Sequence, residues 1–266
     1  MTVLPCRNDL FVQMLNQAGY HPIVLPRSNI TPPDIYLFDD DSFIRWGKLA
    51  TAVPKGSLPK VTVDGALPAF EQKTTSEKSA KGAASFLASA LSCLGITGAP
   101  KIDLSVAAGK EVTFSFIGTT YREISPAEVS HALLQGFDPA GIPAEKVRIG
   151  CIHVAYNYAY ATGLHMQIGT REKGAVKLTA AQIEGIVDVG AQAQVALVEG
   201  TTISFTSKRE PVAFACMVGQ VKAKRGGWTF EPKEAPGLNY TGNEGDSRHY
   251  LMRKGVVLVV DDMGAD

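Results

Sequence analysis

The residues that could carry covalent or acid–base chemistry are few and scattered: four cysteines and five histidines in 266 residues. The cysteines are Cys6, Cys93, Cys151 and Cys216. None stands in a CxxC or Cys/His cluster, so the spacing argues against a metal site. In a chain of this length we expect the last three to be reduced, mostly buried thiols. Cys6 differs, because it lies in a polar N-terminal stretch that we expect to be exposed.

The best arrangement for nucleophilic catalysis pairs Cys151 with His153, two residues away and therefore on the same face of a predicted strand. His165, on the next predicted strand, could meet His153 across a hairpin. A cysteine nucleophile also needs an activated thiolate and a group that orients the base. We find neither, and no Walker loop, dinucleotide fingerprint or GxSxG elbow. We therefore expect no enzyme; a small hydrolase or transferase with Cys151 or Cys216 as nucleophile is the alternative.

The overall composition excludes several classes of function. Lys plus Arg and Asp plus Glu both number 26, so the net charge is about zero. Non-specific nucleic-acid binding needs a basic surplus, and we expect no nucleic-acid partner. No signal peptide and no apolar run of ~18 residues is visible, which predicts a cytoplasmic protein without a transmembrane helix. Insertion as β-strands stays open, because it needs only alternation.

Periodicity and capping signals predict an α+β fold. Helices are expected over 8–18, 76–94, 126–135 and 179–198, from apolar faces, capping boxes and terminal glycines. A strand over 189–195 is the alternative within the last of these. Strands are expected over 22–26, 35–38, 43–53, 102–106, 111–121, 147–160, 164–170, 201–206 and 211–222. Three hairpins are expected, 102–121, 147–170 and 201–222.

The most informative strand pattern is alternation. Apolar residues alternate strictly with polar ones at Val112, Phe114 and Phe116. A second row is expected to share one strand face: Val154, Tyr156, Tyr158 and Tyr160. Such rows suit a soluble sheet packed on one side, and equally a membrane strand with an aromatic girdle. Alternation alone favours the soluble sheet.

An apolar tail follows a polar, Pro- and Gly-rich stretch near the C-terminus. The tail is formed by Val256, Val257, Leu258, Val259 and Val260. Five consecutive aliphatic residues should not be left in water, so we expect them to pack on the preceding domain as an added strand. The stretch before them reads as a flexible, accessible linker.

The N-terminal residues add a resemblance to a family. Cys6, the segment 11–20 ending in Gly-Tyr, the segment 24–27 (Val-Leu-Pro-Arg) and Ile30-Thr-Pro32 resemble the start of bacterial gasdermins. Those proteins begin with a cysteine near the N-terminus, a short helix ending in Gly-Tyr and an LPR-x-x-I-x-P turn. The specific match covers about the first 40 residues, and the length and the compact apolar tail also agree.

The resemblance implies a pore-forming protein of anti-phage defence. The implied fold is a twisted central antiparallel sheet with surrounding helices. The implied domains are a pore-forming domain (1–235), a linker with the cleavage region (236–252) and an autoinhibitory peptide (253–266). An activating protease removes that peptide, and the freed domains oligomerise from monomers into a ring in the inner membrane, killing the infected cell.

The same resemblance implies how the chain meets the membrane. Cys6 is expected to carry covalent palmitate, with no other cofactor and no metal. The segments 102–121 and 147–170 are expected to be the membrane hairpins, and the partners are the protease, membrane lipids and further copies of the chain. A β-rich binding module whose C-terminal strand is purely structural is the alternative from another class.

Overall fold

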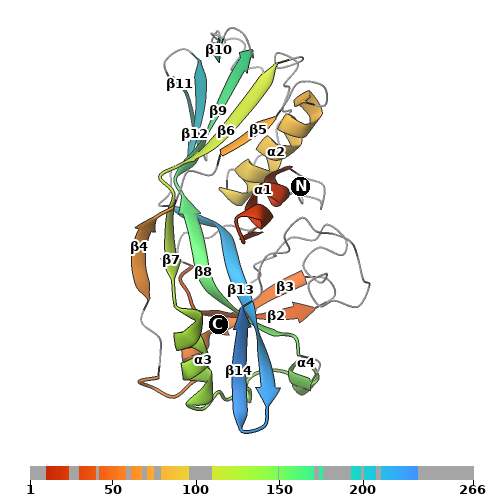
Figure 1. Ribbon diagram of the computed structural model, residues 1–266, viewed down its shortest axis with the longest axis vertical. Coiled ribbons are helices and arrows are strands. Elements are labelled where there is room, and N and C mark those ends of the chain that lie inside the picture. Colours follow the sequence, from red (N-terminus) through yellow and green to blue (C-terminus); the bar gives the residue numbers. More distant parts are fainter. Residues whose placement is uncertain are drawn as a thin grey trace.

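The computed structural model describes residues 10–23, 30–39, 42–57, 61–67, 71–74, 79–95, 110–148, 150–170, 174–175, 193–198, 201–207 and 211–232. Within them the chain forms two sheets, one above the other in Figure 1, and every recorded strand pair is antiparallel. This confirms the predicted α+β class. Cys6, the strand predicted over 102–106, the predicted linker and the apolar tail lie outside the described residues.

The lower sheet has eight strands. Its main path runs β1 (His21–Pro22), β13 (Val212–Lys224), β8 (Ile152–Ala161), β2 (Asp34–Asp39) and β3 (Ser42–Lys48). The other three are β14 (Gly227–Pro232) beside β13, β7 (Thr120–Glu123) beside β8, and β4 (Thr62–Ala66) beside β7. The long strands β8 and β13 pair with each other and form the spine of this sheet (Figure 1).

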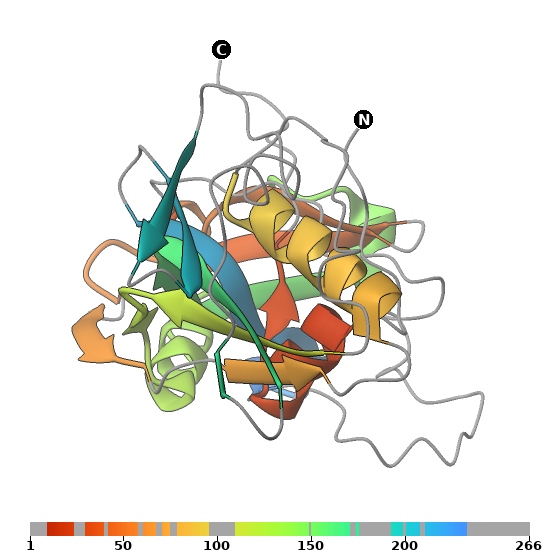
Figure 2. The same ribbon diagram turned by 90° about the horizontal axis from the view of Figure 1, so that it is seen from above.

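The upper sheet has six strands. Its path is β11 (Ala193–Val198), β12 (Thr202–Ser207), β9 (Gly163–Thr170), β6 (Glu111–Ile117) and β5 (Glu71–Thr74), with β10 (Gly174–Ala175) beside β9. Helix α2 (Ser79–Cys93) lies along one face of this sheet in both views, with α1 (Leu10–Gln17) below it (Figures 1 and 2).

The helices begin and end where the local chemistry predicts. Helix α1 ends before Gly19, whose φ of +84° is a left-handed conformation that favours glycine. Helix α3 (Pro126–Leu134) begins after Ser125, whose side chain accepts a hydrogen bond from the Ala127 N–H at 3.3 Å. The described parts confirm the helices predicted over 8–18, 76–94 and 126–135.

Four of the predictions are wrong in part: two strands, one helix and one hairpin. The strand expected over 43–53 ends at Lys48, and Leu49–Thr51 form a 3-10 turn. The strand expected to begin at Val147 begins at Ile152, because α4 (Ala144–Arg148) occupies the start. Residues 193–198 of the last predicted helix form β11, since pairing with β12 overrides the local helix propensity. The strands at 201–206 and 211–222 form no hairpin, because β12 and β13 belong to different sheets.

Candidate functional site

The upper sheet carries an apolar face that the helices cover. Val112, Phe114 and Phe116 are buried, while the residues between them are half-buried, which confirms the predicted alternation. The paired strand β9 contributes Leu164, Met166 and Ile168 to the same core. Helices α1 and α2 contribute the opposite side of this core. The result is an amphipathic sheet whose apolar side is hidden by helices.

Stacked aromatic rings hold the helices onto this face. Phe86 of α2 stacks on Phe114 of β6 with ring centroids 4.4 Å apart, and it meets Phe11 of α1 edge-on at 5.6 Å. Phe116 stacks on Phe214 of β13 at 4.5 Å. Each such pair contributes about 0.5–1.5 kcal/mol of stability beyond the contribution of the apolar area that it buries. The helical cover is therefore a specific contact as well as an apolar one.

The lower part of β8 departs from the predicted single tyrosine face because it contains a β-bulge. Asn157 lies opposite Met217, and Ala155 lies opposite Val218, so Tyr156 is an extra residue in the ladder. A bulge of this kind puts two successive side chains on one side and shifts the alternation by one residue. The sequence carries no glycine or proline here to signal it.

The bulge places the predicted row on two faces, so the prediction of a shared face is wrong. Val154 and Tyr156 pack in the core of the lower sheet, where the Tyr156 ring meets Phe230 edge-on at 5.6 Å. Tyr158 and Tyr160 lie in a separate buried cluster on the other side. All four side chains are buried in this form of the protein.

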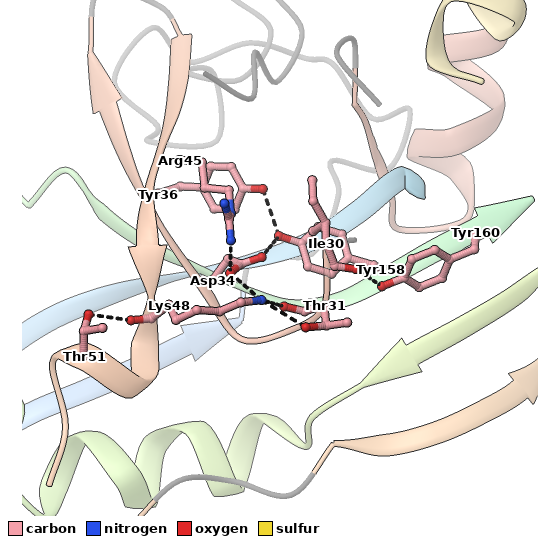
Figure 3. Close-up of polar contacts among 9 residues, drawn as sticks. All are labelled: Ile30, Thr31, Asp34, Tyr36, Arg45, Lys48, Thr51, Tyr158 and Tyr160. Atoms are coloured by element: carbon pink, nitrogen blue, oxygen red, sulfur yellow. Dashed lines mark hydrogen bonds and ion pairs between the residues drawn. The ribbon is translucent and has the colours of Figure 1, made fainter. Parts of the chain in front are cut away.

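A buried polar cluster, shown in Figure 3, joins β8 to β2 and β3. Asp34, which is fully buried, accepts a hydrogen bond from Tyr158 at 2.9 Å and one from Arg45 at 3.0 Å. The Lys48 ammonium lies 2.9 Å from the same carboxylate. The hydroxyls of Tyr36 and Tyr158 are 2.8 Å apart, and burial raises the pKa of Tyr36 well above its ordinary value. We call Asp34, Tyr36, Arg45, Lys48 and Tyr158 the Asp34 cluster.

The end of α1 is fastened to β7 and β8 by a second polar contact. The Tyr20 hydroxyl donates to the Asn157 side-chain oxygen at 3.1 Å, and the Asn157 amide donates to Glu123 at 2.9 Å. Burial, and then the nearby Glu123 carboxylate, raise the pKa of Tyr20 above its usual range. No local sequence signal predicts this contact or the Asp34 cluster, because their members are far apart in the chain.

Among the described residues, the cysteines and histidines form no nucleophilic pair. Cys93 and Cys216 are fully buried and Cys151 is half-buried. Burial raises the pKa of the Cys216 thiol, the reverse of what a nucleophile needs. His153 contacts the Cys151 backbone carbonyl through Nδ1 at 3.0 Å. The predicted approach of His153 and His165 is wrong, since β8 and β9 lie in different sheets.

This burial predicts selective thiol chemistry. In the folded protein a Cys6→Ser variant should react with a chromogenic disulfide reagent at pH 8 at a single site, Cys151. Cys93 and Cys216 should react only after denaturation, because both are inaccessible and the Cys216 thiol stays protonated. Thiol counting before and after denaturant measures this, and Cys151→Ser is the matched control. Fast reaction in the Cys6→Ser/Cys151→Ser variant would contradict the buried placement.

Two further properties of the described residues bear on the site. No described helix has the length and apolar character needed to cross a membrane. Among the residues that have coordinates here, no three His, Cys, Asp or Glu side chains gather as a metal site would require.

The fold and the covered apolar face define a mixed α+β protein with bent antiparallel sheets and a helical cover. The profile of the Bacterial Gasdermin Family matches residues 23–227. A curated relative, gasdermin bGSDM of Piscinibacter sakaiensis, is 48% identical over 265 residues, covering 100% of both chains. A solved bacterial gasdermin from Bradyrhizobium tropiciagri matches with a TM-score of 0.49 and 14% identity, over 83% of this chain and 90% of that one. The chain belongs to the bacterial gasdermin family, whose members are pore-forming proteins and not enzymes.

Proposed function

We propose that the chain is the autoinhibited precursor of a membrane pore that kills the infected cell. A protease cuts the linker 236–252 and removes the peptide 253–266, and the remaining domain, 1–235, oligomerises in the inner membrane. The observation that carries this proposal is the 48% identity that extends over 100% of both chains. The relative therefore has a counterpart of the tail and linker, and not only of the sheets.

The covered apolar face supports the membrane part of the proposal. A strand that enters lipid needs one apolar face, and β6 and β9 have one beneath α1 and α2. Their other face carries uncharged polar side chains such as Thr113, Ser115 and Gln167, which suit a water-filled pore. We therefore propose that the segments 102–121 and 147–170 cross the membrane. Because β8 and β9 do not pair with each other, 147–170 is no hydrogen-bonded hairpin before insertion.

In this proposal the tail inhibits the pore by remaining bound to the domain that precedes it. A Val- and Leu-rich segment bound to its own domain has a high effective concentration, and cutting the linker abolishes that advantage. The cut peptide can then dissociate and leave an apolar surface or strand edge that pairs with lipid or with another copy. The proposed palmitate on Cys6 adds ~0.8 kcal/mol of membrane affinity per buried CH₂.

The test uses the full chain with a recognition sequence for a site-specific protease inserted after residue 244. Adding the protease should release dye from liposomes made of bacterial lipid, and co-expressing it should stop growth. The matched control carries the same insertion with a scrambled recognition sequence, and it should neither leak nor kill. Cys6→Ala should weaken killing without changing cleavage.

Two results would overturn this function. If the cut protein stays inert toward liposomes, or if cutting merely unfolds it, the tail is a structural strand and the pore is wrong. Undiminished killing by Cys6→Ala would remove the lipid anchor alone.

A further inference from the structure

The two sheets meet at a narrow waist, which we define as Gly118, Thr119, Ala161 and Thr162. Strand β6 of the upper sheet passes through Gly118 and Thr119 into β7 of the lower sheet, and β8 passes through Thr162 into β9 (Figure 1). Thr162 fastens the crossing, because its N–H and its hydroxyl both donate to the Ile117 carbonyl, at 2.9 and 3.0 Å.

The pairing register is the same on both sides of this waist. Above it Ile117 lies opposite Gly163, and below it Thr120 lies opposite Tyr160. Three residues forward on one strand therefore match three residues backward on the other. The pairs continue in this register from Glu111 opposite Gly169 down to Glu123 opposite Asn157. The segments β6–β7 and β8–β9 therefore form one two-stranded ribbon, whose pairing is interrupted only at the waist.

The neighbours on the other side of β8–β9 are β12 and β13, and their pairing register is not continuous across the waist. Thr206 of β12 lies opposite Gly163, and Val212 of β13 lies opposite Ala161. The chain therefore advances six residues from β12 to β13 while its partner, β8–β9, moves back by only two. This register cannot be continuous. The ribbon with β6–β7 is therefore the one that could straighten without slipping.

The ribbon turns its faces over at the waist. Above it, Leu164 lies in the core beneath α1 and α2. Ala161 at the waist and Ala159 below it lie in that same core, whereas Tyr158 and Tyr160 lie in the cluster on the opposite side. A regular strand puts residues of the same parity on one face. The present form therefore breaks an alternation that the sequence does not break.

Read as one straight strand, residues 157–168 have two clean faces. The even-numbered positions are Tyr158, Tyr160, Thr162, Leu164, Met166 and Ile168. The odd-numbered positions are Asn157, Ala159, Ala161, Gly163, His165 and Gln167. Apart from Thr162, the first set is apolar with two tyrosines at its end, and the second is small or polar. That is the pattern of a strand between lipid and water with an aromatic belt.

The upper strands are too short to cross a membrane by themselves. β6 has 7 residues and β9 has 8, whereas a tilted membrane strand needs about 9–11. Residues 158–168 and 112–122 match that length if the waist becomes regular strand.

We propose that the waist is a hinge whose straightening creates the membrane-crossing ribbon. In the inserted form, 112–122 and 158–168 are continuous strands that keep the register seen here. Their even-numbered side chains face hydrocarbon, and Tyr158 and Arg122, which are paired already, mark the boundary with water. This inference rests on the proposed pore-forming function and names the lipid-contacting residues of that function.

Gly118 sets the cost of straightening. Its φ is +60°, and a Cβ added to it would lie 2.6 Å from the Thr162 hydroxyl oxygen. Alanine therefore disfavours the bent form, through backbone strain and through that contact, but it fits a straight strand without strain. Gly226 supplies the matched control, because its φ is +94° and nothing lies within 4 Å of its added Cβ. Alanine there strains a turn and leaves the waist intact.

The first test compares these glycines in the full chain carrying the inserted protease site. After cleavage, Gly118→Ala should release dye from liposomes about tenfold faster than the parent, while Gly226→Ala should match the parent. If Gly118→Ala alone proves too unstable to purify, Gly118→Ala/Thr162→Ala relieves the close contact and keeps the backbone strain. It should still leak faster than the parent.

The second test needs no change at a glycine. Thr119 and Thr120 are neighbours, both half-buried here, and they have opposite parity in a straight strand. Each is replaced by Cys in a Cys6→Ser/Cys151→Ser background and labelled with an environment-sensitive fluorophore. On cleavage with liposomes, the label at 120 should brighten and shift to the blue, and the label at 119 should stay water-like.

The outcomes separate the hinge from the pore. Leakage by the cleaved parent and by the labelled Cys6→Ser/Cys151→Ser proteins, with equal rates for the two glycine variants and water-like labels at both threonines, overturns the hinge and leaves the pore standing. Absence of leakage from the cleaved parent overturns the pore and the hinge with it. A faster Gly118→Ala and a lipid signal at 120 alone support the hinge.

Discussion

Replacing Asp34 by Asn should lower the free energy of unfolding by about 3 kcal/mol. The carboxylate is fully buried and holds Arg45, Lys48 and the Tyr158 hydroxyl, so an amide would leave two cations facing each other without their anion. The effect falls at the lower end for a buried pair, because the Arg45 and Lys48 side chains are 16% and 37% exposed. Urea unfolding at neutral pH measures it.

The matched control is Glu231→Gln on β14. Glu231 pairs with Lys222 and Lys224, and hydrogen bonds from these lysines lower its pKa. All three side chains are at least 42% exposed, so the pair is screened by solvent and the loss should stay below about 1 kcal/mol. Equal losses for the two variants would show that the Asp34 cluster is no special anchor of β8.

Local sequence signals predicted the elements that local chemistry determines. Gly19 marks the end of α1, Ser125 and Pro126 mark the start of α3, and the alternation around Phe114 gives β6 its buried face. Each signal acts within one or two turns of chain. The same is true of the N-terminal motif, which identified the family before any fold was known.

The predictions that failed concern features that depend on contacts with residues far along the chain. The bulge at Tyr156 exists because β13 pairs with β8 in two offset registers, and nothing near Tyr156 signals it. Residues 193–198 form β11 because β12 lies beside them. The Asp34 cluster needs Tyr158 to reach Asp34 across 124 positions. Single-sequence periodicity has no access to such pairing.

The waist interrupts an alternation that is continuous in the sequence. The even-numbered positions of β8 and β9 do form one alternating row in the sequence, from Tyr158 to Ile168. The present form splits that row at Thr162, because the ribbon turns over there. We infer that the sequence encodes the straight strand and the bent strand together, and that packing against α1 and α2 selects the bent one before insertion.

Phe86→Ala should lower the free energy of unfolding by about 3–5 kcal/mol. The ring is fully buried in α2 between Phe114 and Phe11, and its removal leaves a cavity where the helix meets the upper sheet. Leu134→Ala is the matched control, because Leu134 is 56% exposed. This replacement should change the free energy of unfolding by no more than about 0.5 kcal/mol. Denaturant unfolding of both variants measures the difference, and equal midpoints would contradict this packing.

The same variant separates the helical cover from overall stability. If the cover restrains the sheet, the cleaved Phe86→Ala protein should release dye several-fold faster than the cleaved parent. Asp34→Asn removes a comparable amount of stability from the lower sheet without touching the cover. If it speeds leakage equally, the barrier follows global stability and the cover has no special role. If only Phe86→Ala does so, the contact of α2 with the upper sheet is the barrier, because that face must be uncovered before lipid can take the place of the helices.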